Sequence, residues 1–319
     1  MHAVDVSHVS KSFADKVAVR DLSFTVEPGE VLGLIGPNGA GKTTTIRMLM
    51  DIFQPDSGEV RVLGKPPSES TKDRIGYLPE ERGLYRKLRA IDCIVYLATL
   101  KGMDRRAAEK RASLLLDQTG MLAASTKKVE ELSHGMAQLV QFVVTIVHDP
   151  DLVVLDEPFQ ALDPVNAELL RQKILDLRAQ GKAIIFSTHT MNDFEELSDR
   201  VLMLDHGQAV LYGSLAEIRA RFRGNSVLLS ANGGIGDLPG VRETRAHKSY
   251  VELVLDGRTS PQDVLRRLVA LDVTVDRFEV ATPSLNEIFL RVVGERRGAE
   301  RNGVGQNGGK RNGGESREE

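Results

Sequence analysis

The chain has 319 residues, enough for one large domain and a smaller one, and its 41% hydrophobic and 27% charged residues are ordinary for a globular protein with a sizeable core. The formal net charge of −3 lacks the basic excess of nucleic-acid-binding domains, so no nucleic-acid partner is expected. The single cysteine, Cys93, excludes an intramolecular disulfide and a multi-cysteine metal site. No signal peptide is recognisable, and no apolar run approaches the roughly 20 residues of a membrane span. We therefore expect a cytoplasmic protein whose membrane role, if it has one, comes through a partner.

Residues 1–224 alternate between strand-like and helix-like segments. The short apolar runs at 31–35, 152–155 and 183–186 are typical of strands buried on both faces of a sheet. Strands of this kind, joined through helices, predict an α/β domain with a largely parallel central sheet.

Two local patterns refine this α/β prediction. The alternation of Leu22, Phe24 and Val26 predicts an additional half-buried strand, which we expect to be antiparallel. Asp163 and Pro164 have the residue types that cap and begin a helix, so a helix is expected to follow them.

The last third of the chain has a different organisation. Residues 225–293 contain strand-like runs and two helix-like segments, which predicts a small α+β accessory domain. In residues 294–319, glycine and charge dominate, and such a composition cannot bury enough apolar surface to offset the entropy of ordering. We expect this tail to be disordered.

A phosphate-binding loop follows the first buried strand. Its glycines let backbone N–H groups surround an anionic phosphate, and the helix that follows adds partial positive charge at its N-terminus. Lys42 would reach the β- and γ-phosphates of a nucleotide, and the hydroxyl of Thr43 would ligate Mg²⁺. The predicted nucleotide-binding residues are Gly36, Pro37, Asn38, Gly39, Ala40, Gly41, Lys42, Thr43 and Thr44.

Two carboxylates end the strand predicted at 152–155. Asp156 is placed to bind Mg²⁺, directly or through water, and Glu157 is placed to polarise an attacking water molecule. A strand ending in Asp-Glu is weak evidence alone, but together with the phosphate loop it predicts a nucleotide-hydrolysing site.

Further segments resemble the ATP-binding cassette (ABC) ATPases. The sequence Leu-Ser-His-Gly-Met at 132–136 is similar to the signature motif of that family, and Ala-Leu-Asp at 161–163 is similar to its D-loop. His189 matches the switch histidine, Glu80 lies at the position of the Q-loop glutamine, and Phe13 matches the aromatic residue that stacks on adenine. Phe13 could instead be an ordinary core residue.

The resemblance covers residues 1 to about 224 and implies a fold with an antiparallel β subdomain and a helical subdomain. It implies that ATP is held between two ATPase subunits, with Ser133 and Gly135 of one copy facing the γ-phosphate bound by the other. It also implies catalytic roles for His189, Asp163 and Glu80, and Glu80 would in addition be a metal ligand. The second subunit would be an identical copy or a related cassette.

Three residues depart from the family pattern. Glu80 stands where glutamine is usual and adds negative charge beside the phosphates, while His134 and Met136 replace glycine and glutamine in the signature. Together with Pro-Glu-Glu-Arg-Gly-Leu-Tyr at 79–85 and the segment at 284–290, these departures resemble the sodium-extrusion and drug-resistance branch of exporters.

The function implied is that of an ATP-hydrolysing subunit that drives export through a separate membrane-spanning subunit from the inner face of the cell membrane. Leu84, Tyr85, Leu88 and Ile91 are candidates to contact that partner, or else pack in the core. The alternative function is a soluble, non-transport ABC ATPase of DNA repair or translation. The single phosphate loop and the short, heptad-free interval between Glu80 and Ser133 favour transport.

Overall fold

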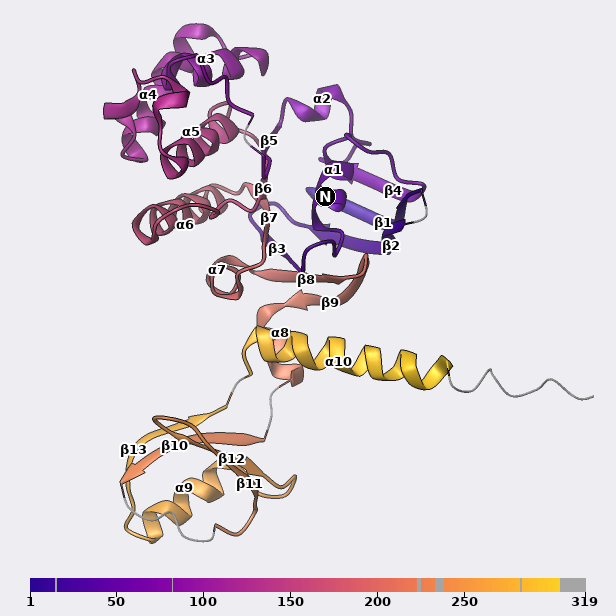
Figure 1. Ribbon diagram of the computed structural model, residues 1–319, viewed down its shortest axis with the longest axis vertical. Coiled ribbons are helices and arrows are strands. Elements are labelled where there is room, and N and C mark those ends of the chain that lie inside the picture. Colours follow the sequence, from indigo (N-terminus) through magenta and orange to yellow (C-terminus); the bar gives the residue numbers. More distant parts are fainter. Residues whose placement is uncertain (15, 82, 223–224, 233–237, 282, 305–319) are drawn as a thin grey trace, which may run out of the picture. The chain divides into compact units, whose positions relative to one another are not determined.

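The computed structural model describes residues 1–304 except 15, 82, 223–224, 233–237 and 282. The chain forms two compact units, Met1–Leu215 and a second unit that begins at Ala216 (Figure 1). The division falls earlier in the chain than residue 224, because the helix that ends at Phe222 groups with the second unit. In the described part of the chain, no helix is both long enough and apolar enough to cross a membrane.

A six-stranded sheet forms the centre of the first unit. Its strands are β3 Val31–Ile35, β5 Ile75–Leu78, β6 Leu152–Asp156, β7 Ala183–Thr188, β8 Arg200–Asp205 and β9 Gln208–Ser214. They lie in the order β5-β6-β7-β3-β8-β9, and every pairing except β8 with β9 is parallel. Every residue of β3, β6 and β7 is buried, as expected for apolar strands covered on both faces. The predicted parallel core sheet is confirmed.

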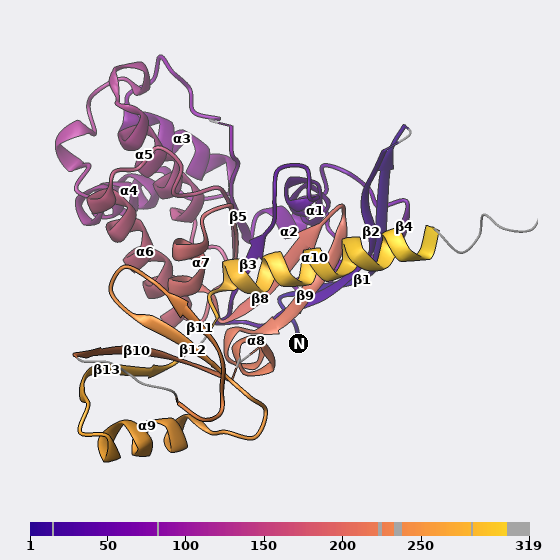
Figure 2. The same cartoon turned by 60° about the horizontal axis from the view of Figure 1, so that its bottom comes forward.

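A three-stranded antiparallel sheet lies beside this centre. It contains β1 Val4–Phe13, β2 Lys16–Val26 and β4 Ser57–Val62, in the order β2-β1-β4. Leu22, Phe24 and Val26 of β2 are buried and alternate with more exposed residues, so they form the predicted half-buried strand. Figures 1 and 2 show this sheet on one side of the central sheet and a helical group on the other.

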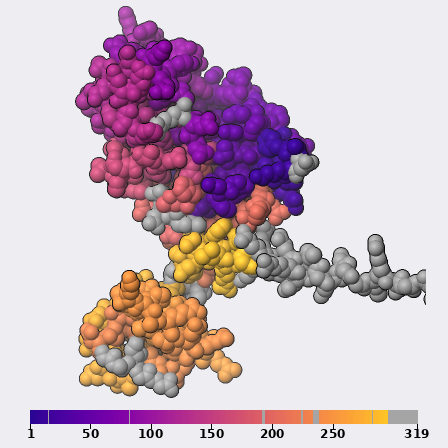
Figure 3. Space-filling view, viewed as in Figure 1, coloured from indigo at the N-terminus to yellow at the C-terminus, as the bar shows by residue number. Residues whose placement is uncertain are grey.

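The helical group consists of α3, α4 and α5, and it forms part of the surface seen in Figure 3. Asp163 caps α6 as predicted, since its side chain accepts hydrogen bonds from the N–H groups of Val165 and Asn166. The bounds are α1 Lys42–Leu49, α2 Glu69–Lys72, α3 Ala90–Leu100, α4 Arg105–Gln118, α5 His134–Ile146, α6 Pro164–Ala179 and α7 Met191–Leu197, with 3₁₀ turns at Leu122–Ala124 and Val129–Glu131.

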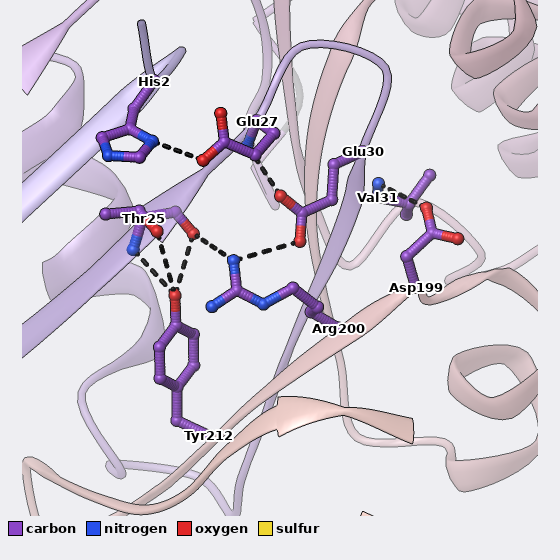
Figure 4. Close-up of polar contacts among 8 residues, drawn as sticks. All are labelled: His2, Thr25, Glu27, Glu30, Val31, Asp199, Arg200 and Tyr212. Carbon is purple, nitrogen blue, oxygen red and sulfur yellow. Dashed lines mark hydrogen bonds and ion pairs between the residues drawn. The ribbon is translucent and has the colours of Figure 1, made fainter. Parts of the chain in front are cut away.

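Polar contacts join the two sheets at the amino end of β3 (Figure 4). The phenol oxygen of Tyr212 in β9 accepts a hydrogen bond from the N–H of Thr25 in β2 at 2.9 Å. Arg200 at the start of β8 lies over the Tyr212 ring, 4.5 Å from its centroid, and 3.3 Å from a carboxylate oxygen of the buried Glu30. A carboxylate oxygen of Asp199 accepts from the N–H of Val31 at 2.9 Å. These contacts fix the start of β3, whose other end leads into the phosphate loop.

The second unit has an antiparallel sheet of order β11-β12-β10-β13. Among its described residues, one core cluster contains seven buried apolar residues, including Val264 and Leu268 of helix α9. Leu271, which follows the last residue of α9, is 57% exposed and lies outside this core. The elements are α8 Leu215–Phe222, β10 Ser226–Asn232, β11 Val241–Ala246, β12 Val251–Leu255, α9 Pro261–Ala270, β13 Thr274–Val280 and α10 Leu285–Val304.

The end of the chain differs from the sequence-based expectation at one point. Helix α10 continues to Val304, so residues 294–304, expected to be disordered, have helical backbone. Residues 305–319, the rest of the predicted disordered tail, lie outside the described part of the chain.

Candidate functional site

The phosphate loop connects the end of β3 to the start of α1. Lys42 is only 7% exposed, and its Nζ donates to the carbonyl oxygen of Gly36 at 2.7 Å, so the side chain folds back over the loop. Gly41 has a φ of 106°, and a Cβ built there would lie 2.6 Å from the carbonyl oxygen of Ala18. Glycine is therefore required at this position for both conformation and space. The loop exposes backbone N–H groups at a helix N-terminus, the arrangement that binds phosphate.

A cavity of about 400 Å³ opens over this loop. It brings together residues from β1, the loop, the end of β5 and the end of β6, as expected where parallel strands present their carboxyl ends at one edge. Lys16 and Ala18 also face this cavity and had not been expected there. Its lining residues are Phe13, Lys16, Ala18, Asn38, Gly39, Ala40, Gly41, Lys42, Thr43, Thr44, Glu80, Asp156 and Glu157.

The two carboxylates at the end of β6 differ in their surroundings. Asp156 is 1% exposed; its Oδ1 accepts a hydrogen bond from the Ser187 hydroxyl at 2.5 Å, while its Oδ2 is buried without a hydrogen-bond partner among the described residues. Glu157 has a φ of 51°, in the left-handed region, and its carboxylate lies 2.9 Å from Nδ1 of His189. His189 does not line the cavity itself, but this contact places it at the same edge.

The donor set suits a magnesium ion. Asp156 Oδ2 is a buried carboxylate oxygen with no hydrogen-bond partner within the described ranges of the chain, and Thr43 and Glu80 supply further oxygens to the same cavity. Mg²⁺ prefers carboxylate and hydroxyl oxygens and is usually completed by phosphate and water. Burial, reinforced by the nearby Asp156 carboxylate, raises the pKa of the Tyr77 phenol, which stays protonated near neutral pH.

The predicted signature residues lie at the start of α5 and do not line the cavity. The hydroxyl of Ser133 accepts from the N–H of Met136 at 3.3 Å and caps the helix. A Cβ at Gly135 would lie 3.3 Å from the carbonyl oxygen of Ala161, so the helix start packs against the segment predicted as the D-loop. Asp163, at the end of that segment, has a lowered pKa because the N–H and the side-chain amide of Asn166 donate to it. Gly36 and Pro37 flank the lining residues without belonging to them.

Three buried polar residues at this edge were missed by sequence reasoning. Ser187 in β7 contacts Asp156, as described above. In α5, Gln138 donates to the carbonyl oxygen of Pro158 and Gln141 donates to that of Pro79, each at 3.1 Å. Both glutamines thus hold the backbone next to a predicted site residue. The available signal was polar side chains inside otherwise apolar segments, which is unusual unless they have hydrogen-bond partners.

A parallel sheet with a phosphate loop after one strand and paired carboxylates after another defines a P-loop nucleoside triphosphatase. The family model described as ABC transporter matches residues 19–160, and the model described as ATP-binding protein DrrA1-3-like, C-terminal domain, matches residues 213–293. The chain belongs to the ABC transporter ATP-binding proteins and is an ATPase subunit of that family, with a DrrA-like C-terminal domain.

Individual relatives agree with this assignment. The chain is 38% identical to the ABC transporter ATP-binding protein YhaQ of Bacillus subtilis over 292 residues, covering 91% of this chain and 98% of YhaQ. It is 33% identical to Nod factor export ATP-binding protein I of Sinorhizobium fredii, covering 92% and 86%. A solved ATP-binding subunit of an ABC transporter superposes with a TM-score of 0.64 at 29% identity, covering 69% and 93%. The predicted family, fold class and ATPase function are confirmed.

Proposed function

We propose that this chain hydrolyses Mg²⁺-bound ATP at the described cavity and thereby drives export through a separate membrane-spanning subunit. The observation that carries the proposal is the cavity itself, because it gathers the phosphate loop, Glu80 and both carboxylates of β6 at one edge of the sheet. A relative that covers nearly the whole chain is named for Nod factor export, which supports the direction of transport.

Each part of the cavity has a role in binding the substrate. The N–H groups of the loop and the ammonium group of Lys42 hold the β- and γ-phosphates of ATP. Thr43, Asp156 and Glu80 would hold Mg²⁺, which neutralises charge on the phosphates. Phe13, which is 41% exposed at the cavity, offers an apolar face to adenine.

Hydrolysis then requires an activated water molecule. The Glu157 carboxylate accepts a hydrogen bond from water and polarises it, while His189, 2.9 Å away, fixes the orientation of that carboxylate. The water oxygen attacks the γ-phosphorus, the bond to the bridging oxygen of ADP breaks, and ADP and phosphate are released. In our proposal, Asp163 orders the neighbouring loop through its helix cap.

A second ATPase subunit completes the site in this proposal. Ser133 and Gly135 lie at a helix N-terminus outside the cavity of their own chain, which suits contact with a γ-phosphate held by another copy. ATP would draw the two copies together and hydrolysis would release them. The partner is an identical copy or a related cassette.

The membrane subunit would dock on an aromatic surface after Glu80. Tyr85 and Tyr96 are 48% and 44% exposed, and their rings meet edge to face at 5.4 Å; Leu100, on the same helix as Tyr96, is 61% exposed. Exposed aromatic pairs of this kind are typical of interface centres. Through this contact the chain would be held at the inner face of the membrane.

Two measurements test the proposal. Purified protein should bind ATP, and it should release phosphate only when Mg²⁺ is present. Lys42→Ala should weaken ATP affinity by about tenfold or more, as expected for losing a charged hydrogen-bond donor. Lys110→Ala, at an exposed position on α4, is the control. Tight ATP binding by Lys42→Ala would contradict the site.

The docking surface is tested separately. Tyr96→Ala should reduce co-purification with the co-expressed membrane protein, whereas Leu114→Ala, at a 55% exposed position on α4, should not. Equal recovery of the partner with both variants would contradict this surface. ATP binding by the purified chain should be unchanged in either variant.

A further inference from the structure

Ser187 is a buried serine at the end of β7 whose hydroxyl lies between the two carboxylate residues. It is 0% exposed, and the strand register pairs it directly with Asp156. The strand around it is apolar, apart from Thr188 next to it. A hydroxyl in such a place is costly to bury unless it is fully hydrogen-bonded, so its contacts indicate what it is for.

The Ser187 hydroxyl is both a hydrogen-bond donor and a hydrogen-bond acceptor. It donates to Oδ1 of Asp156 at 2.5 Å and accepts from the backbone N–H of Glu157 at 3.0 Å. The first contact fixes the rotation of the Asp156 carboxylate and leaves Oδ2 as the oxygen without a partner among the described residues. The second satisfies the N–H of a residue whose φ of 51° is unfavourable for a side chain other than glycine. One hydroxyl therefore holds a metal-ligand side chain and the backbone of the catalytic carboxylate.

We propose that Ser187 is a positioning residue that sets both Asp156 for Mg²⁺ and Glu157 for water activation; this inference rests on the proposed function. Groups that orient metal ligands without touching the metal generally affect metal affinity or activity by about 10- to 100-fold. Without the hydroxyl, the Asp156 carboxylate is free to rotate and the N–H of Glu157 loses its partner. The hydrogen bonds of the Ser187 hydroxyl described above go to Asp156 and Glu157, so we expect the phosphate loop to keep its shape.

A purely structural role makes a different prediction. If the hydroxyl only satisfies buried polar groups, its removal lowers the melting temperature without changing the response to Mg²⁺. Ser198 provides the comparison, because it is also a buried serine of the first unit, and its hydroxyl has no hydrogen-bond partner in the part of the chain described here.

The experiment compares full-length Ser187→Ala with Ser198→Ala and the parent protein. Nucleotide affinity is measured by calorimetry with ATP in EDTA and with ATP and excess Mg²⁺. We expect Ser187→Ala to bind ATP in EDTA within about twofold of the parent, and the tightening caused by Mg²⁺ to fall by about tenfold. Turnover should fall by a similar factor or more, while Ser198→Ala matches the parent in all three measurements.

The outcomes separate the possible failures. A parent-like Mg²⁺ response in Ser187→Ala, or the same loss in Ser198→Ala, overturns the positioning role. Absence of nucleotide binding by the parent protein itself would instead overturn the proposed function. If Ser187→Ala does not fold, Ser187→Cys keeps nearly the same size with a weaker donor, and a parent-like Mg²⁺ response there overturns the inference as well.

Discussion

Each of the two units contains a cavity, and the two cavities are similar in size. Their acidic residues differ in whether a buried carboxylate oxygen lacks a hydrogen-bond partner. In the first unit, the cavity of about 400 Å³ includes Asp156, whose Oδ2 is buried without a hydrogen-bond partner among the described residues. In the second unit, a cavity of about 510 Å³ is lined by Glu252 and Glu287, which are both engaged. Glu252 accepts from the hydroxyl of Ser226 at 3.0 Å, and Glu287 accepts from the N–H of Ser284 at 2.8 Å.

This difference distinguishes carboxylates that we expect to act in catalysis from carboxylates that stabilise the fold. A buried carboxylate oxygen that the fold leaves without a partner is costly, and its cost is offset when a ligand supplies the missing interaction. In the second cavity, where Glu252 and Glu287 accept hydrogen bonds from their own unit and no phosphate loop lines the cavity, we expect the carboxylates to contribute mainly to structure. We therefore expect acidic residues of the first cavity to control turnover and those of the second cavity to leave it unchanged.

The largest expected effect is that of Glu157→Gln in the first cavity. The same isosteric change at Glu252 in the second cavity is the comparison. Glu157→Gln removes the group that polarises water, so turnover should fall by roughly 10²- to 10⁴-fold while ATP stays bound. Glu252→Gln in the second unit should leave turnover within about twofold, consistent with a local role of its hydrogen bonds. Phosphate release and ATP binding by the two purified variants are the measurements. Unaltered hydrolysis by Glu157→Gln would remove that residue from its role.

The second prediction tests whether the second unit is stabilised by its own core. Leu268 is 0% exposed and belongs to that core, so Leu268→Ala should destabilise the unit by about 2–5 kcal/mol. Val269→Ala, at the next position of α9 but 68% exposed, should change stability by less than about 0.5 kcal/mol. Calorimetric melting should show a shifted transition in the first variant, with ATP binding retained. Loss of ATP binding together with that transition would contradict independent cores.

How far the sequence predicts this molecule depends on the range of the interactions involved. The phosphate loop, the Asp-Glu pair and the Asp163 cap are local patterns, and each lies where the sequence placed it. The contact of Ser187 with Asp156 depends on the register between β6 and β7, two strands separated by α6. A single sequence does not reveal such a register, so that contact could not be predicted.

The second unit shows the same limit in a different form. Its strands and α9 follow alternation and capping patterns, but the extent of α10 does not follow from composition. Glycine and charge after residue 293 favoured disorder, whereas the helix continues to Val304. Composition averages over a segment and says little about where a helix that begins earlier in the chain ends.

A third prediction compares two serines that cap helices in the two units. Ser133 caps α5, and Ser260 caps α9 by accepting from the N–H of Asp263 at 3.2 Å. Each Ser→Ala change should cost about 1 kcal/mol of local stability. Ser133→Ala should additionally lower turnover by about tenfold, because its hydroxyl is proposed to bind a phosphate held by the other subunit. Equal turnover in the two variants would contradict contact across the dimer.

The Ser260 cap also gives a pH dependence. Hydrogen bonds from the hydroxyl and the N–H of Ser260 hold the pKa of Asp263 below its ordinary value of 3.8. A lowered pKa means that the stabilisation is present above the ordinary value and is lost as the pH falls through the folded-state pKa. The parent should therefore lose part of its advantage over Ser260→Ala when melting is measured in acid, and a constant difference from pH 7 to pH 3 would contradict this linkage.

The smallest expected effect concerns Glu80, which places a negative charge in the cavity at the position that resembles the Q-loop glutamine of ABC ATPases. Glu80→Gln removes repulsion between that charge and the phosphates, so ATP affinity measured in EDTA, without Mg²⁺, should rise by about threefold, a change of under 1 kcal/mol. Glu81→Gln is the matched control, since Glu81 is exposed and does not line the cavity. Because salt screens exposed charges, the gain from Glu80→Gln should shrink at high ionic strength if it is electrostatic. With Mg²⁺ present the gain should be smaller or reversed, because the Glu80 carboxylate is also proposed to ligate the metal. Unchanged or weaker ATP binding by Glu80→Gln in EDTA would contradict the repulsion.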